Sequence, residues 1–261
     1  MSPRRWFDQA WPDLTDLAGT TEVGLVPVGA VEQHGPHLPT GTDTIIATGL
    51  CERVSERTGA PVLPAISVGC SYGHSTNLPG NLSLTPEQLA AQARQWAEWA
   101  ATSGLTRLLF VNAHFGNAPS LLVATDHLRL YRTDLRVGVV NWWTLDPTVA
   151  AESTADGDDL HANRTETAVM LELAPELVHL DRMADADDED RTADLVFRYT
   201  VPALSTNGVT GRPSEATPEL GRKLVDLTVD ALADRVERGR LEEPPLGVAP
   251  PPPLTVPSPP A

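Results

Sequence analysis

The chain reads LVPVGAVEQHGPHLPTGTD from residue 25 to residue 43. Its first four residues form an apolar run that is typical of a buried strand. A polar stretch rich in glycine and proline follows, and apolar residues at helical spacing then predict a helix over residues 44–57. A strand, a long loop and a helix in this order predict one unit of an α/β fold.

The same order recurs further along the chain. Residues 62–66 are a second strand candidate, in which Pro64 favours an edge position. Two more strands and four helices are predicted over residues 108–111 and 137–141, and over residues 84–103, 119–131, 165–173 and 218–238. Thr85 and Gln88 have the spacing of a capping box at the start of the first of these helices. The alternation predicts a parallel or mixed sheet sandwiched by helices.

Composition divides the chain into one domain and a tail. We expect residues 1–240 to form a single domain, and the proline-rich residues 241–261 to form an extended or disordered tail. Residues 181–194 are dense in acidic side chains and predict a solvated surface loop, with a cation site as the alternative.

Charge and hydropathy exclude several classes of partner. The 261 residues have a formal net charge of −16, which argues against nucleic acid and anionic membranes as partners. Two cysteines are too few for a disulfide scaffold, and no apolar run approaches the roughly 20 residues that span a bilayer. The first residues lack the apolar segment of a signal peptide, so we expect a cytoplasmic protein.

Side chains that bind metals gather in the predicted loops. In open α/β sheets, ligands bind beyond the carboxyl ends of the strands. The loops at this edge, and the starts of the helices that follow, hold Glu32, His34, Asp43, His114 and Glu166. Imidazole and carboxylate are suitable ligands for divalent cations. The spacing alone leaves two interpretations open, which are a metal site or unrelated caps, turns and surface groups.

Four blocks of the sequence resemble the creatininase (creatinine amidohydrolase) family of metal-dependent amidohydrolases. The blocks are VPVGAVEQHGPHLPTGTD at residues 26–43, GCSYGHSTNLPGNLSL at 69–84, FVNAHFGN at 110–117 and DLHANRTET at 159–167. The resemblance implies a three-layer α/β/α sandwich with a mostly parallel sheet. It also implies two divalent metal ions, with zinc expected first and manganese or iron as alternatives.

The resemblance assigns roles to particular residues. The implied metal ligands are Glu32, His34, Asp43, His114 and Glu166, with Asp43 bridging the two ions. Gly116 stands where creatininase itself has a glutamate ligand, so Glu166 takes that place. The expected reaction is attack by a metal-bridging hydroxide on the C–N bond of an amide, lactam or cyclic amide, with His161 as proton shuttle. Asp159 either orients His161 or only caps a helix.

The implied substrate contacts are Trp143, His74 and Ser75, and a structural hydrogen bond is the alternative for His74. Asn117 and His37 are expected to support the loops around the metals. Gly157 replaces a second aromatic wall of creatininase, which argues against creatinine as the substrate.

Several expectations concern the reaction and the partners. We favour a small amide over a peptide, because block 69–84 has no obvious match to the family's peptidases. The alternatives are a metallopeptidase or deformylase of the family, and a catalytically idle member that only binds a ligand. The family also implies a homo-oligomer, a hexamer in related enzymes.

Overall fold

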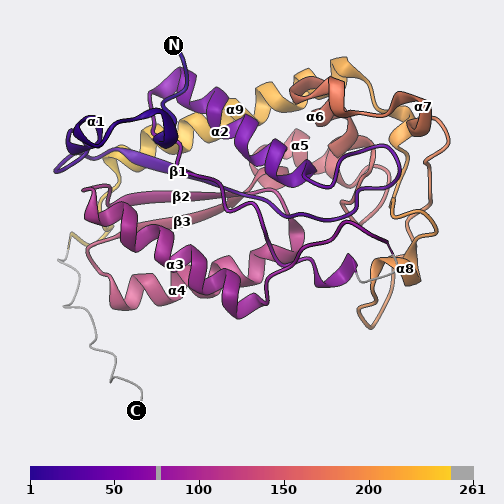
Figure 1. Cartoon of the computed structure of the whole chain (residues 1–261), viewed down its shortest axis with the longest axis horizontal. Coiled ribbons are helices and arrows are strands. Elements are labelled where there is room, and N and C mark those ends of the chain that lie inside the picture. Colours follow the sequence, from indigo (N-terminus) through magenta and orange to yellow (C-terminus); the bar gives the residue numbers. More distant parts are fainter. Residues whose placement is uncertain (75–77, 248–261) are drawn as a thin grey trace.

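The computed structural model describes residues 1–74 and 78–247. Its centre is a parallel sheet of three strands in the order β1-β2-β3. The strands are β1 (Val23–Val28), β2 (Arg107–Asn112) and β3 (Arg136–Asn141). Figure 1 shows the sheet edge-on between two helical layers, which confirms the three-layer α/β/α sandwich.

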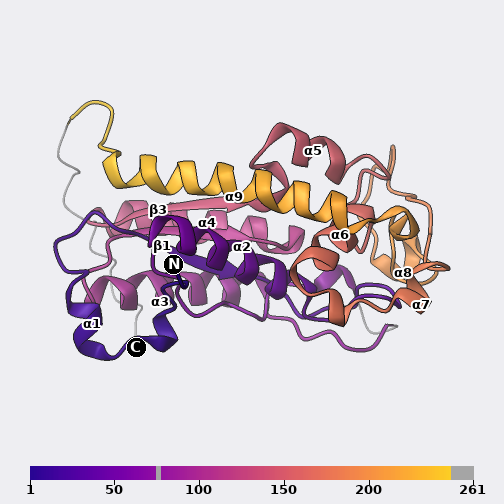
Figure 2. The ribbon, with the colours of Figure 1, turned by 90° about the horizontal axis from the view of Figure 1, so that it is seen from above.

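The helices are α1 (Trp11–Thr15), α2 (Thr42–Thr58), α3 (Pro86–Thr102), α4 (Ala118–Tyr131), α5 (Pro147–Ser153), α6 (Arg164–Leu173), α7 (Leu180–Met183), α8 (Val201–Leu204) and α9 (Pro218–Leu241). Helices α2, α6 and α9 pack together on one face of the sheet, and α3 and α4 cover the other (Figures 1 and 2). Helices α7 and α8 lie at one end of the molecule (Figure 1).

Alternating residues of the strands build two apolar cores. Leu25 and Val111 belong to the core under α2, α6 and α9. Val26 and Phe110, which are partners in the β1–β2 register, belong to the core under α3 and α4. Because both faces of β1 and β2 are covered, nearly every side chain in these two strands is buried.

The predicted helices are found within three residues of their expected ends, and the capping box of Thr85 and Gln88 begins α3. The strand predicted at residues 62–66 is wrong as a strand. Val62 and Ile66 form only isolated parallel bridges, Val62 with Arg5 and Leu25, and Ile66 with Val28. The N–H of Leu63 donates to the carbonyl of Leu25, and the next donor to β1 is Ile66, where a regular ladder would use residue 65. The pairing therefore skips one residue in the segment that holds Pro64.

The acidic segment 181–194 is mostly exposed and irregular, apart from α7 at its start. Asp188 is an exception, because it is buried and accepts hydrogen bonds from Ser205 and Thr206. Residues 248–261 of the predicted tail lie outside the described residues. Within residues 1–74 and 78–247, no helix has the length and apolar character needed to cross a membrane.

Candidate metal centre

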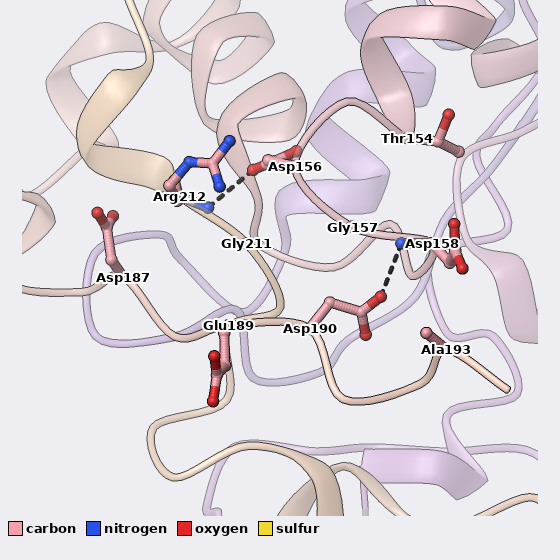
Figure 3. Close-up of a pocket in the computed structure, with 10 residues that line it drawn as sticks. All are labelled: Thr154, Asp156, Gly157, Asp158, Asp187, Glu189, Asp190, Ala193, Gly211 and Arg212. Carbon is pink, nitrogen blue, oxygen red and sulfur yellow. Dashed lines mark hydrogen bonds between the residues drawn. The ribbon is translucent and has the colours of Figure 1, made fainter. Parts of the chain in front are cut away.

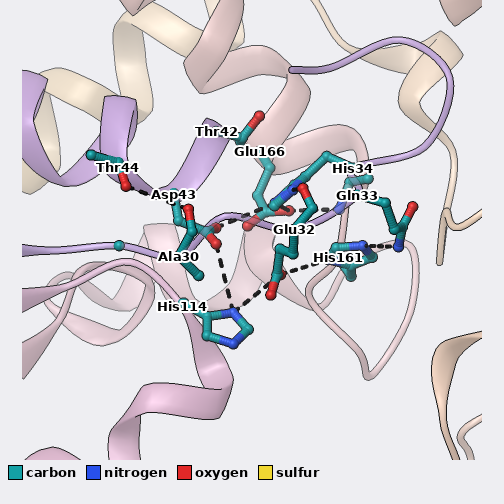
Figure 4. Close-up of polar contacts among 12 residues, drawn as sticks. Ala30, Glu32, Gln33, His34, Thr42, Asp43, Thr44, His114, His161 and Glu166 are labelled. Atoms are coloured by element: carbon teal, nitrogen blue, oxygen red, sulfur yellow. Dashed lines mark hydrogen bonds and ion pairs between the residues drawn. The ribbon is translucent and has the colours of Figure 1, made fainter. Parts of the chain in front are cut away.

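The five expected metal ligands meet at the carboxyl ends of β1 and β2 (Figure 4). Glu32 and His34 follow β1, and His114 follows β2. Asp43 lies in the first turn of α2, and Glu166 lies in the first turn of α6. All five are buried, with 6% or less of each residue exposed. Segments far apart in the sequence therefore bring their ligand-type side chains into one buried site.

Asp43 connects two groups of these side chains. Its Oδ1 lies 3.2 Å from His34 Nε2, and its Oδ2 lies 3.7 Å from His114 Nδ1. On one side, Glu166 Oε2 is 3.9 Å from His34 Nε2, and on the other, Glu32 Oε1 is 3.2 Å from His114 Nδ1. Because each carboxylate oxygen of Asp43 faces a different histidine, its position matches that of a bridge between two cations.

Unsatisfied atoms show that this site fits cations. Both oxygens of Glu32, Oδ2 of Asp43 and Nε2 of His34 are buried and make no hydrogen bond within the described part of the chain. Glu32, Asp43 and Glu166 form ion pairs with histidines, but with no lysine or arginine among the described residues. Burying three carboxylates without such partners is costly unless other positive charge is present. The site therefore fits a binuclear metal centre.

Burial and the neighbouring charges shift the pKa values of the clustered histidines and carboxylates. Burial alone would lower the pKa of His34, but the surrounding carboxylates, Asp43 first, raise it to about 10. Burial likewise opposes the effect of Glu32 on His114, whose pKa is raised to about 9. Burial raises the pKa of Glu166 to about 8, against the opposing charge of His34. The carboxylates thus stabilise positive charge in the site, whether on a histidine or on a bound cation.

Local structure at the start of α6 positions Glu166. Asn163 caps the helix, since its side chain accepts hydrogen bonds from the N–H groups of Thr165 and Glu166. The N–H of Ala162 donates to Glu166 Oε2 at 2.6 Å. The cap is Asn163, so the alternative that Asp159 caps this helix is wrong.

Two side chains hold the loops together. Asn117 accepts a hydrogen bond from the N–H of Cys70 and donates to the carbonyl of Gly29, each at 2.9 Å, so it joins three loops. His37 Nε2 lies 2.8 Å from Thr167 Oγ1 on α6. Both contacts match the supporting roles that the sequence predicts.

Two further histidines and one glutamine line the inside of the cluster. His74 Nε2 lies 3.1 Å and His161 Nδ1 lies 3.7 Å from Glu32 Oε1. Burial and the charges of neighbouring histidines hold the pKa of His161 well below its ordinary value. Gln33, which the sequence reasoning missed, contacts both rings. The only available signal was its place between Glu32 and His34.

A pocket of about 700 Å³ opens onto these groups. Glu32, His74, His114, Asp159 and His161 line its floor, and aromatic side chains including Tyr72, Phe115 and Phe197 line its walls. The predicted substrate residue His74 and the predicted catalytic residues Asp159 and His161 thus line one pocket. Ser75 lies outside the described residues.

Trp143 has a different place from the one expected. It is buried and does not line the pocket found among the described residues. Its ring stacks on Phe115 with 4.6 Å between centroids, and Phe115 lines the pocket instead. Phe115 therefore forms part of the pocket lining, and Trp143 contributes by stacking on it.

A second pocket, of about 550 Å³, lies among acidic side chains (Figure 3). Asp190 accepts a hydrogen bond from the N–H of Asp158, and Asp156 accepts one from the N–H of Arg212, each at 2.7 Å. No three of its carboxylates converge as cation ligands in the described part of the chain. These acids hold loops together, and the alternative of a cation site in segment 181–194 gains no support.

The chain is similar to known proteins over most of its length. The family model described as creatinine amidohydrolase matches residues 8–236. The chain is 33% identical over 223 residues to the mycofactocin precursor peptide peptidase of Mycolicibacterium smegmatis, covering 82% of this chain and 84% of the relative. It is 31% identical over 227 residues to the creatinine amidohydrolase of Pseudomonas putida, covering 81% and 87% respectively.

Solved structures share the fold. A crystal structure of creatinine amidohydrolase (creatininase) matches with a TM-score of 0.82 and 28% identity, covering 93% of this chain and 100% of that chain. A zinc–zinc type mutant creatininase and a manganese creatininase match with TM-scores of 0.80 and 0.77, each at 28% identity and covering 91% and 90% of this chain and 98% of their own. The family model, the relatives and the fold agree, and the chain belongs to the creatininase family.

Proposed function

We propose that the protein is a binuclear metal-dependent amidohydrolase that cleaves a C–N bond in a small molecule. The observation that supports this most strongly is the position of Asp43, whose two oxygens face two separate histidines in a fully buried site. A group of carboxylates placed for structure alone would be paired with arginine or lysine, or hydrogen-bonded.

In this proposal, Glu32, Asp43 and His114 would hold one ion, and His34, Asp43 and Glu166 would hold the other. Zinc is the first expectation, and manganese or iron are alternatives, because imidazole and carboxylate accept all three. When bound, such a pair supplies Lewis acidity toward a carbonyl oxygen and lowers the pKa of water toward neutrality.

A side chain of the protein has to donate a proton to the leaving nitrogen. Asp159 and His161 line the pocket beside the proposed metal ligands. We propose His161 as the proton shuttle, with Asp159 assisting it. Burial, with the charge of Asp190, raises the pKa of Asp159 to about 6. A carboxyl group with this pKa keeps its proton up to about pH 6, higher than an ordinary aspartate does, and can then release it to a developing amine.

The substrate is proposed as a small amide, lactam or cyclic amide. The pocket of about 700 Å³ lies within the usual size range of sites for small molecules, and aromatic walls suit a flat group. A peptidase is the second candidate, because a relative with 33% identity is named as one. The relatives divide between these chemistries and do not favour the small amide.

The test is hydrolysis by the metal-loaded protein. The zinc and manganese forms would be incubated with creatinine, with short peptides and with an N-formyl amine, and creatine, free amino acids and formate would be measured. We expect turnover of at least one class, and its loss in Asp43→Asn. If neither metal form hydrolyses any class while a characterised relative does so in the same assay, the idle ligand-binding alternative is supported. Light scattering on the same samples would measure the proposed homo-oligomer.

A further inference from the structure

We propose that Gln33 is a positioning residue that fixes the tautomer of His161, so that His161 faces the metal centre with a proton on Nδ1. The catalytic consequence rests on the proposed function. The tautomer itself follows from contacts of the described residues and is tested separately.

Backbone groups fix the orientation of the Gln33 amide. Its Oε1 accepts a hydrogen bond from the N–H of Gly35 at 2.9 Å, and its Nε2 donates to the carbonyl of Gly208 at 3.2 Å. The side chain is buried, with 6% of the residue exposed. Turning the amide over would place its NH₂ against the N–H of Gly35 and its oxygen against the carbonyl of Gly208. Both hydrogen bonds would be replaced by repulsion.

The second proton of the amide nitrogen has a defined partner. Nε2 of Gln33 lies 2.7 Å from His161 Nε2 and 3.2 Å from His74 Nδ1. An amide nitrogen only donates hydrogen bonds, so the nitrogen that it meets at 2.7 Å has to accept. A neutral imidazole whose Nε2 accepts has its proton on Nδ1. In His161 that atom lies 3.7 Å from Glu32 Oε1, at the edge of the proposed metal centre.

The loop at Gly208 is built around this amide. Gly208 has a φ of +87°, and a Cβ there would lie 1.8 Å from Gln33 Oε1. Its N–H is held by Ser205 Oγ at 2.9 Å, and Ser205 in turn donates to the buried Asp188. A glycine is therefore required both by the backbone conformation and by the space that the amide occupies.

The contacts restrict what His161 can do in a reaction. The lone pair of Nε2 is occupied by the N–H of Gln33, so the ring presents an N–H rather than a lone pair toward Glu32. Any proton that His161 passes on in its expected role as proton shuttle would therefore leave from Nδ1.

The direct test is solid-state ¹⁵N NMR of the zinc-loaded protein with labelled histidine, in which His161→Asn identifies the signals of His161. We expect a protonated Nδ1 and an unprotonated Nε2 in the wild type. In Gln33→Glu the carboxylate accepts instead of donating, so the proton should move to Nε2. A wild-type proton on Nε2, a metal-bound His161 ring, or an unchanged tautomer in Gln33→Glu would each overturn the proposal.

A glycine pair provides an independent test that leaves residue 33 unchanged. Gly208→Ala should displace the amide and release the tautomer, with unchanged zinc content. Gly59→Ala is the matched control, because Gly59 also has a positive φ but has open space around it. If a substrate has been found, Gly208→Ala should lower kcat at least tenfold with little change in KM. Should no substrate be found, the NMR result still decides the tautomer, so the two proposals fail separately.

Discussion

Gly116 bears on the proposal that Glu166 is a metal ligand. A Cβ at residue 116 would lie 2.3 Å from the carbonyl oxygen of Cys70 and 2.5 Å from His114 Nε2. This close approach leaves no room for a side chain there, so a carboxylate ligand would have to come from another element. The proposed ligand is Glu166, which is buried on α6 beside His34.

Glu166→Gln should therefore weaken the binding of one of the two proposed ions. A neutral amide is a poor ligand, so the dissociation constant of the ion near His34 should rise roughly 10- to 100-fold or more, the range seen when even outer partners of a metal are lost. Glu172→Gln, on the same helix and paired with Arg53, is the matched control and should keep both ions. Titration calorimetry measures this, and equal loss in the two variants would contradict the assignment.

The pocket carboxyl Asp159 gives a prediction for pH. Burial and Asp190 raise its pKa to about 6, so it keeps its proton to a higher pH than an ordinary aspartate. If the protonated form serves the leaving nitrogen, kcat falls as the pH rises through about 6. Asp159→Asn should remove this limb and lower kcat by roughly 10²- to 10⁴-fold. A limb that survives in Asp159→Asn would assign it to another group.

At the scale of elements, one helix cap contributes both to the stability of the fold and to the position of a proposed metal ligand. Asn163→Ala removes the cap of α6 and should lower the free energy of unfolding by about 1–2 kcal/mol. Because the same cap holds Glu166 in place, metal affinity should fall as well. Thr217→Ala removes the comparable cap of α9, which accepts from Leu220. It should cost similar stability with no change in metal affinity, measured by denaturant unfolding and calorimetry.

The sequence predicts elements whose signals are local. The helices and the strands β2 and β3 follow from periodicity, and capping residues mark where α3 begins. The segment at Val62 and Ile66 shows the limit, since its apolar run predicts a strand although the pairing with β1 skips one residue between its two bridges. A local pattern of residues cannot show whether a segment will pair regularly with its neighbouring strand.

The site shows the same division between local and distant information. The four sequence blocks that resemble the family contain all five proposed ligands. The role of Gln33 was not predicted, because the contact that orients its side chain comes from Gly208, 175 residues away. The place of Trp143 behind Phe115 likewise depends on how the loops after β2 and β3 pack together. Such contacts exist only in the assembled fold.

For the whole molecule, the proposed metal centre should contribute stability as well as chemistry. Two core layers meet the sheet, and the buried carboxylates lie where β1, α2 and α6 converge. A cation that binds only the folded state stabilises it by about 2.7 kcal/mol at 100 times its dissociation constant. For a chain of this size, a chelator that removes one ion should therefore lower Tm by roughly 5–10 °C, and one that removes both ions by about twice as much.

That loss of Tm should reverse when zinc or manganese is restored, as followed by scanning calorimetry. Calcium should restore little, because it prefers six to eight oxygen ligands over imidazole. A Tm that is insensitive to chelation in protein shown to be metal-free would contradict a structural contribution of the ions.

The most direct test of the central claim is the number of metal ions per chain, measured by plasma mass spectrometry on protein loaded with zinc and then desalted. The account predicts two ions per chain in the wild type and in Asp126→Asn, an exposed control on α4, and at most one in Asp43→Asn. One ion or none in the loaded wild type, or two ions in Asp43→Asn, would contradict it.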